Sequence, residues 1–174
     1  AKRRLSAKVF GESMFASANF SIMILLIVSA AVAFSQILAF TGATYGMVDA
    51  VLALEMSNRA IVFMMIMLVV FLGMFMGPVP IMLITLPIFV PIVKQFGLDP
   101  IWFAALFLVA IETGATSPPF GAALFVMRAV APKGTTMGDI YRAAVPFIIC
   151  DLLAILILFF VPELVTVPVD MMFK

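Results

Sequence analysis

Residues 112–121, Glu-Thr-Gly-Ala-Thr-Ser-Pro-Pro-Phe-Gly, hold most of the groups in this chain that can do chemistry. They combine a carboxylate with three hydroxyls in an otherwise apolar segment. Oxygen ligands of this kind suit hard cations such as Na⁺. We therefore predict a Na⁺ site whose ligands are the hydroxyls of Thr113, Thr116 and Ser117 and backbone carbonyls around Gly114.

A continuous helix cannot pass through this segment. Pro118 and Pro119 lack a backbone N–H, and Ser117, which precedes a proline, is pushed out of the helical region. Residues 101–131 are otherwise apolar, so the break is expected at membrane depth. Freed backbone groups are tolerated there only against protein or a watery cavity. The sequence predicts a discontinuous transmembrane helix with an ion or substrate site at its break.

Two carboxylates are predicted at membrane depth, at Glu112 and Asp151. Such groups are costly and by default face a bundle interior or a water-filled cavity. We expect Glu112 to tune the cation site or to bind a proton, and the alternative that it only bonds neighbouring amides stays open. Asp151 follows Pro146 closely, so a structural role, satisfying backbone freed by that proline, is the preferred interpretation.

The composition defines an all-α integral membrane protein. Of 174 residues, 66% are hydrophobic and 11% are charged, and the mean hydropathy of +1.29 far exceeds that of a soluble domain. There is no His, and the single Cys150 lies in an apolar run. Catalytic triads that need His, soft-metal sites and disulfides therefore have no candidates. No catalytic residue, enzyme activity or nucleic-acid partner is predicted.

The chain begins with a basic arm, residues 1–13, that precedes a first span at residues 15–40. This apolar run is long enough to cross a hydrocarbon core of about 30 Å and too long for a signal-peptide core. Residues 45–58 have the spacing of a short amphipathic helix and are expected at the interface. We interpret the chain as a piece of a longer membrane subunit.

Residues 60–76 and 81–95 form two apolar arms joined by Gly77-Pro78-Val79-Pro80. Each arm is marginal or short for a span, so a pair of short spans and a re-entrant hairpin both remain open. Two apolar stretches interrupted by Gly and Pro indicate a transporter's binding site, which favours the hairpin. The two interruptions are expected to face each other near the bilayer midplane.

The distribution of Lys and Arg predicts the orientation. If residues 101–131 cross the membrane once, seven basic residues lie on the N-terminal side and three on the other, whereas a double crossing gives four and six. Cytoplasmic loops carry an excess of Lys and Arg, so we predict a single broken crossing, a cytoplasmic N-terminus and a periplasmic C-terminus. The seven are Lys2, Arg3, Arg4, Lys8, Arg128, Lys133 and Arg142; the three are Arg59, Lys94 and Lys174.

Several short motifs, in their order and spacing, resemble the C-terminal half of the large membrane subunit of TRAP transporters, and the likeness covers nearly the whole chain. They are Gly73-Met-Phe-Met-Gly-Pro78, Leu86-Pro-Ile-Phe-Val-Pro-Ile92, Gly97-Leu-Asp-Pro-Ile-Trp-Phe103, Thr116-Ser-Pro-Pro-Phe-Gly121 with Leu124-Phe-Val126, and Tyr141-Arg-Ala-Ala-Val-Pro-Phe147. The resemblance implies a Na⁺-driven importer of organic acids, such as dicarboxylates or sugar acids, in the bacterial inner membrane. It also implies that a periplasmic binding protein delivers the substrate.

The family's large subunit has two inverted repeats, each with a re-entrant hairpin and a broken helix, and it works as an elevator against a scaffold. This chain resembles the second repeat. The implied partners are the first repeat, a small membrane subunit, the binding protein, the organic acid and the lipid bilayer. The implied domains are a cytoplasmic arm at 1–13, a scaffold span and interfacial helix at 14–58, and half of the mobile domain at 59–174, with the hairpin at 59–96, the broken helix at 100–131 and the last span at 144–162.

The resemblance also implies which residues form the site. The family's Na⁺ contacts correspond to Gly77 and Pro78 at the hairpin tip and to Thr113, Gly114, Thr116 and Ser117 at the break. Substrate contacts are expected at Thr116, Ser117, Pro118 and Pro119. The tip has no polar side chain here, whereas many members have one, so contacts there must be main-chain. Many members also carry an amide near the position of Glu112.

Three other classes of protein are alternatives. A related carboxylate or anion symporter would share the broken helices and need no binding protein, and it could be coupled to protons. An intramembrane aspartyl protease requires a second Asp, and Asp151 has no such partner at membrane depth. A subunit that only assists assembly would have no use for two interrupted segments.

Overall fold

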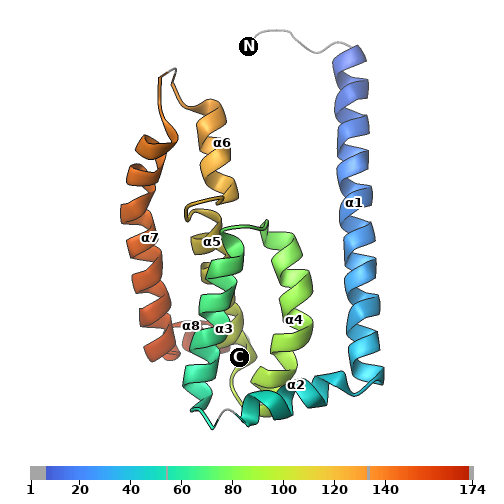
Figure 1. The fold of residues 1–174 in the computed structure, drawn as a ribbon, viewed down its shortest axis with the longest axis vertical. Helices are drawn as coiled ribbons and strands as arrows, with labels where there is room; N and C mark the ends of the chain where they lie inside the picture. Colours follow the sequence, from blue (N-terminus) through green and yellow to red (C-terminus); the bar gives the residue numbers. More distant parts are fainter. Residues whose placement is uncertain (1–6, 54, 133, 173–174) are drawn as a thin grey trace. The chain divides into compact units, whose positions relative to one another are not determined.

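The computed structural model describes residues 7–53, 55–132 and 134–172, and every regular element among them is an α-helix (Figure 1). In order, the helices are α1 (Ala7–Phe40), α2 (Ala43–Leu52), α3 (Asn58–Gly73), α4 (Pro78–Gln95), α5 (Pro100–Ala115), α6 (Ala122–Val130), α7 (Met137–Phe160) and α8 (Glu163–Met172). Helix α1 forms one compact unit, and α2 to α8 form a second. The all-helical prediction is confirmed.

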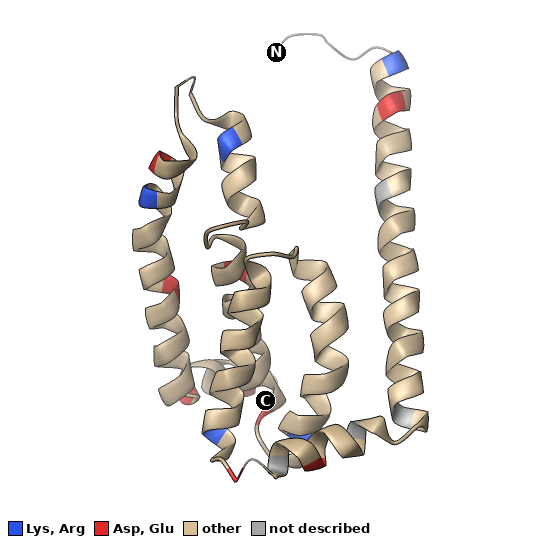
Figure 2. Cartoon of the chain, in the orientation of Figure 1, with Lys and Arg blue, Asp and Glu red and all other residues tan. Residues whose placement is uncertain are grey.

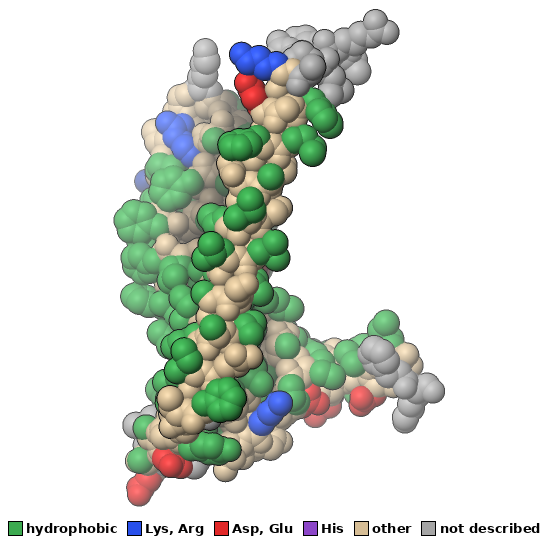
Figure 3. All heavy atoms as spheres, turned by 90° about the vertical axis from the view of Figure 1, so that its right-hand side faces the viewer, with side chains coloured by type: hydrophobic (Ala, Val, Ile, Leu, Met, Phe, Trp, Pro, Cys, Tyr) green, Lys and Arg blue, Asp and Glu red, His purple; other side chains and the backbone are tan. Residues whose placement is uncertain are grey.

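Helix α1 has 34 residues and a length of about 50 Å at 1.5 Å per residue. Its charged residues, Lys8 and Glu12, both lie near its N-terminal end. Hydrophobic side chains cover its visible face from there to its other end (Figure 3). In the described part of the chain, α1, α4 and α7 are the helices long and apolar enough to cross a membrane. The prediction of an integral membrane protein agrees with this finding.

Helices α3 and α4 form a helical hairpin connected by residues 74–77 (Figure 1). Ser57 caps α3 by accepting a hydrogen bond from the N–H of Ala60 at 3.3 Å. Helix α4 starts at Pro78, a position where a missing N–H costs nothing. Pro87 and Pro91 lie inside α4 without interrupting it. The hairpin therefore has one interruption, at its Gly/Pro tip.

The second interruption separates α5 from α6. Helix α7 runs antiparallel along both: the Tyr141 hydroxyl donates to the Pro119 carbonyl at 2.8 Å, and the Trp102 indole N–H donates to the Leu158 carbonyl at 2.7 Å. Helix α6 therefore continues in the direction of α5, as expected for a single broken crossing. The break itself lies at residues 116–121, where the sequence predicted it.

One predicted helix boundary was wrong. The amphipathic helix covers Ala43–Leu52 rather than 45–58, since Ser57 already caps the next helix. Helix α7 contains most of the last span predicted at 144–162, which stays a prediction, and it begins at Met137, where Thr136 and Asp139 form a capping box. Helix α8 was not predicted at all. Helix α2 packs on α4, and the proposed division into scaffold and mobile parts stays a prediction.

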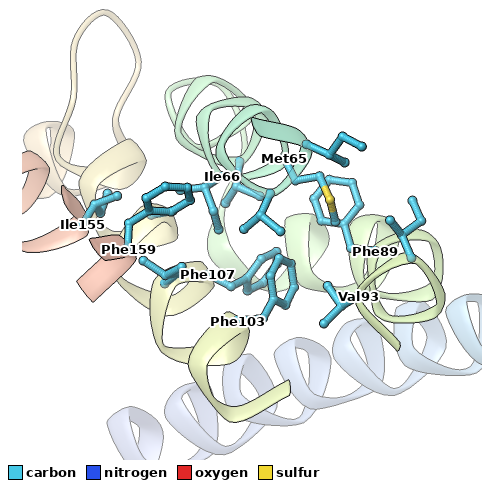
Figure 4. Close-up of a cluster of buried hydrophobic side chains, with 14 of the residues drawn as sticks. Met65, Ile66, Phe89, Val93, Phe103, Phe107, Ile155 and Phe159 are labelled. Atoms are coloured by element: carbon cyan, nitrogen blue, oxygen red, sulfur yellow. The ribbon is translucent and has the colours of Figure 1, made fainter. Parts of the chain in front are cut away.

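The core of the second unit lies between α3, α4, α5 and α7 (Figure 4). Helix α5 is central: it packs against α3, α4 and α7, and Leu106 and Ala110 on it are fully buried. The labelled side chains in Figure 4 are Met65, Ile66, Phe89, Val93, Phe103, Phe107, Ile155 and Phe159. The hairpin, the first half of the broken helix and α7 therefore share one core.

The charged residues of this unit lie mainly toward the ends of its helices (Figure 2). Arg59 is in the first turn of α3 and Lys94 in the last turn of α4, so both lie at the base of the hairpin. Arg128 is in the last turn of α6, beyond the break. Within this unit Arg59 and Lys94 are therefore separated from Arg128, and sidedness itself stays a prediction. Lys2, Arg3, Arg4, Lys133 and Lys174 lie outside the described residues.

Replacing Trp102 with Phe is expected to destabilise the fold by about 1–3 kcal/mol. Residue 162 is proline, so the Leu158 carbonyl lacks its usual helical donor and the Trp102 indole takes that place. The free energy of unfolding of the full subunit in detergent would measure the loss. In a Pro162→Ala background a backbone N–H is restored, so the same change should cost less. An equal loss in both backgrounds would contradict this explanation.

Candidate ion and substrate site

The helix ends at the two interruptions touch backbone to backbone. A Cβ atom on Gly73, the last residue of α3, would lie 2.7 Å from the Cα of Gly114, and one on Gly114 would lie 2.6 Å from the Cα of Gly73 and 2.7 Å from the carbonyl oxygen of Val70. Side chains do not fit at such distances, so glycine is required at both positions. The C-terminal ends of α3 and α5 are held side by side by this contact.

The residues just beyond these glycines also meet. The rings of Phe75, at the hairpin tip, and Phe120, in the break, have centroids 5.8 Å apart. The tip and the break therefore adjoin, as the sequence predicted. Their depth in a bilayer stays a prediction.

Prolines leave backbone carbonyls without donors at both interruptions. A helical carbonyl normally accepts from the N–H four residues later, and proline has none. The carbonyls are those of Met74, Met76 and Ala115, and the residues four positions later are Pro78, Pro80 and Pro119. No hydrogen bond reaches these three oxygens from any residue that the structure describes. The tip and the break thus offer unpaired carbonyl oxygens.

The three hydroxyls of the break all donate to carbonyls of α5. Ser117 Oγ donates to Thr113 O at 2.6 Å, and Thr116 Oγ1 lies 3.0 Å from Glu112 O and 3.1 Å from Thr113 O. A hydroxyl that donates its hydrogen keeps lone pairs that can accept a cation. Thr113 Oγ1 donates to Val109 O at 2.7 Å, one turn farther from the break, so its hydroxyl is the least well placed of the three.

Gly121 closes the break into a tight loop. Its N–H donates to the Ser117 carbonyl at 3.1 Å, and a Cβ atom on it would lie 2.5 Å from Ala115 O and 2.6 Å from Ser117 O. Ser117 itself is 3% exposed. The loop is therefore a packed element with a defined geometry.

The two carboxylates lie in different surroundings. Glu112 is exposed on α5, and no hydrogen bond joins its carboxylate to an amide that the structure describes. Asp151 is half-buried in α7, and within the described ranges no hydrogen bond joins its side chain to the backbone near Pro146. The roles of both stay predictions.

The remaining predicted site residues lie around this contact. Gly77 is half-buried, with the Pro80 Cδ 3.9 Å from where its Cβ would lie, and Pro78 is exposed at the start of α4. The direct contacts of the hairpin with the break come from Gly73 and Phe75 instead. Gly114 is buried in that contact, while Pro118 is half-buried and Pro119 is exposed.

An apolar cavity of about 590 Å³ opens between α6 and α7, and Thr116 lies on its wall. Leu124, Met127 and Phe147 are among its apolar lining residues, and Asp139 adds a carboxylate. Among the described residues no cluster of His, Cys, Asp or Glu could hold a metal ion, so a cation here would depend on hydroxyl and carbonyl oxygens.

Sequence reasoning missed Gly73 and Tyr141. Gly73 and Gly77 form a G-x-x-x-G spacing, a signal of close helix contact in membranes that would have identified Gly73. The bond from Tyr141 to Pro119 joins residues 22 positions apart in the chain, and no local pattern predicts it.

Apolar helices, a helical hairpin and a broken helix that meet at unpaired backbone groups define the class of membrane carriers with discontinuous helices. Comparison with known families agrees. Residues 1–164 match the model of the tripartite ATP-independent periplasmic transporter, DctM component. The chain belongs to this family.

Three similar proteins carry the names of TRAP transporter permeases. The large permease of a C4-dicarboxylate transporter of Pseudomonas aeruginosa is 32% identical over 84% of this chain and 34% of its own length. An ectoine/5-hydroxyectoine large permease of Ruegeria pomeroyi is 29% identical over 87% of this chain and 35% of its own length. An isethionate permease of Oleidesulfovibrio alaskensis is 30% identical over 93% of this chain and 25% of its own length. The chain spans about a third or less of these relatives, which are permeases rather than enzymes.

Proposed function

We propose that the protein is the second repeat of the large membrane subunit of a Na⁺-coupled transporter that imports organic acids across the bacterial inner membrane. The observation that carries this proposal is the contact between Gly73 and Gly114, which brings the hairpin tip to the broken helix. The substrate names of the relatives, C4-dicarboxylate and isethionate among them, support an acidic substrate.

The electrostatics of the helix ends support a cation site between α3 and α5. A helix C-terminus carries a partial negative charge on its unpaired carbonyls, and two such ends lie side by side here. Glu112 adds a formal negative charge, and the sequence has no Lys or Arg between Lys94 and Arg128. A Na⁺ ion held by Ser117, Thr116 and nearby carbonyls would offset this negative charge.

The start of α6 supports an anionic substrate. Helix α6 starts after Gly121, which offers no side chain to the first turn, whereas α4 starts with Pro78-Val79-Pro80 and has few N–H groups to offer. The free N–H groups of a helix N-terminus favour anions. A substrate carboxylate bound there, beside Thr116, Ser117, Pro118 and Pro119, would lie close to the cation, which couples the binding of the two.

The shared core supports movement as a single body. The hairpin, α5 and α7 pack through one cluster, so they can move past the rest of the transporter without losing their own contacts. An elevator motion requires this property. The remaining partners in this proposal are the first repeat, a small membrane subunit and a periplasmic binding protein.

Removing one hydroxyl from the break is expected to weaken Na⁺ coupling. Ser117→Ala and Thr116→Val should each raise the Na⁺ concentration for half-maximal uptake several-fold, on the scale of about 1 kcal/mol per lost polar contact. The Na⁺ concentration for half-maximal uptake is measured with the complete transporter in liposomes and a panel of organic acids, with and without Na⁺ and the binding protein. Thr166→Val, in α8, is the matched control. Uptake by the membrane subunits alone would instead favour the anion-symporter alternative.

Neutralising Glu112 separates its two proposed roles. If Glu112 tunes the cation site, Glu112→Gln should shift the Na⁺ dependence of uptake while the protein still assembles, because the carboxylate makes no hydrogen bond to the described amides. If Glu112 binds a proton, the parent protein should follow a proton gradient and the variant should lose that response. Unchanged Na⁺ and proton dependence in the variant would remove Glu112 from the mechanism.

A further inference from the structure

Tyr141 connects α7 to the middle of the break. Its hydroxyl donates to the Pro119 carbonyl at 2.8 Å, from the second turn of α7. Pro119 lies two residues after Ser117, so the bond acts directly beside the proposed ligands.

The position of the Pro119 carbonyl strongly restricts the position of Ser117. Each proline ring fixes the φ angle of its residue, so few torsions separate the Pro119 carbonyl from Ser117. Ser117 is fixed on its other side as well, since its hydroxyl donates to Thr113 O at 2.6 Å and its carbonyl accepts from Gly121 N–H at 3.1 Å. Releasing the Pro119 carbonyl would free the one side of the loop that these two bonds do not hold.

The α7 end of this link is itself anchored. The Thr136 and Asp139 capping box fixes the start of α7, and the Arg128 guanidinium of α6 donates to the carbonyl of Thr135. One of these hydrogen bonds joins α6 to the residue before the cap of α7, and the other joins α7 to the loop that precedes α6.

Apolar packing does not replace these links. The cavity of about 590 Å³ separates α6 from α7 between the two links. Leu124 is the one buried side chain that the structure describes on α6. The shared core holds α5 on α7, so the hydrogen bond of Tyr141 acts on the loop after α5, where it fixes the Pro119 carbonyl.

We propose that Tyr141 is a positioning residue, whose hydroxyl holds the Pro118-Pro119 segment so that Thr116 and Ser117 keep the geometry needed to bind the coupling cation and the substrate. This inference rests on the proposed function. Tyr141 acts through Pro119 and is not itself a ligand.

The test compares Tyr141→Phe with Tyr45→Phe in the complete transporter reconstituted in liposomes. Tyr45 is the other tyrosine of the chain and is 75% exposed in α2, far along the chain from the break. Tyr141→Phe is expected to raise the Na⁺ concentration for half-maximal uptake several-fold, with maximal uptake at saturating Na⁺ and the melting temperature without Na⁺ close to those of the parent. Tyr45→Phe should match the parent in all three.

The possible outcomes are distinguishable. A parent protein whose uptake ignores Na⁺ would overturn the proposed function itself. A Na⁺-dependent parent with an unchanged half-maximal concentration in Tyr141→Phe would overturn the positioning role alone. A variant that fails to assemble, or that loses maximal uptake and melting temperature together at an unchanged half-maximal concentration, would assign Tyr141 to the fold and also overturn the inference.

Discussion

Replacing Gly114 with alanine is expected to abolish uptake by the complete transporter. The new Cβ atom would lie 2.6 Å from the Cα of Gly73 and 2.7 Å from the carbonyl oxygen of Val70. Both neighbours are backbone atoms, so no side chain can rotate away and the helices must separate. Severe overpacking of this kind lowers the free energy of unfolding by about 3 kcal/mol or more. Separation moves the hairpin tip away from the break, and the proposed site is lost.

Gly46→Ala is the matched control, because nothing lies within 4 Å of a Cβ atom at that position in α2. Alanine there should leave uptake unchanged and stabilise the helix by up to about 1 kcal/mol. The measurements are uptake in liposomes and the melting temperature of the purified transporter. Full uptake by the Gly114→Ala variant would mean that contact between α3 and α5 is not needed for transport.

Gly121→Ala is expected to have the second-largest effect, and a more local one. Its Cβ atom would lie 2.5 Å from Ala115 O and 2.6 Å from Ser117 O, inside the loop that closes the break. The loop must open to admit it, which displaces the carbonyl and hydroxyl of Ser117. The helices around the break keep their core, so we expect assembly to persist while Na⁺-dependent uptake is lost.

Gly138→Ala provides the comparison for this change, since the nearest atom to its Cβ, Thr136 Oγ1, would be at an ordinary 3.6 Å. It should transport like the parent. Size-exclusion chromatography confirms assembly of both variants before uptake is measured. If Gly121→Ala assembles and retains normal Na⁺ dependence, the geometry of the break does not control cation binding.

The interruptions were predictable because their signals are local. Proline removes a donor wherever it stands in a helix, so Pro118 and Pro119 imply a break from the sequence alone, and Gly77 with Pro78 implies the hairpin tip. The structure places helix ends at both. The order of the apolar segments was predictable as well, because runs of apolar residues are also a local signal.

The contacts between segments were less predictable, because they depend on residues far apart in sequence. Gly73 and Gly114 approach through helix packing, and the exposure of Glu112 follows from which side of α5 faces α3. The start of α7 at Met137 depends on the cap at Thr136, which lies outside the apolar run that indicated the last span.

Equilibrium binding of radioactive Na⁺ to the purified complete transporter, without binding protein or substrate, tests whether the hairpin tip and the break form a Na⁺ site. We expect saturable binding by the parent and by Gly46→Ala, several-fold weaker binding by Ser117→Ala, and none by an assembled Gly121→Ala variant. No saturable binding by the parent, or equal binding by all four proteins, would contradict it.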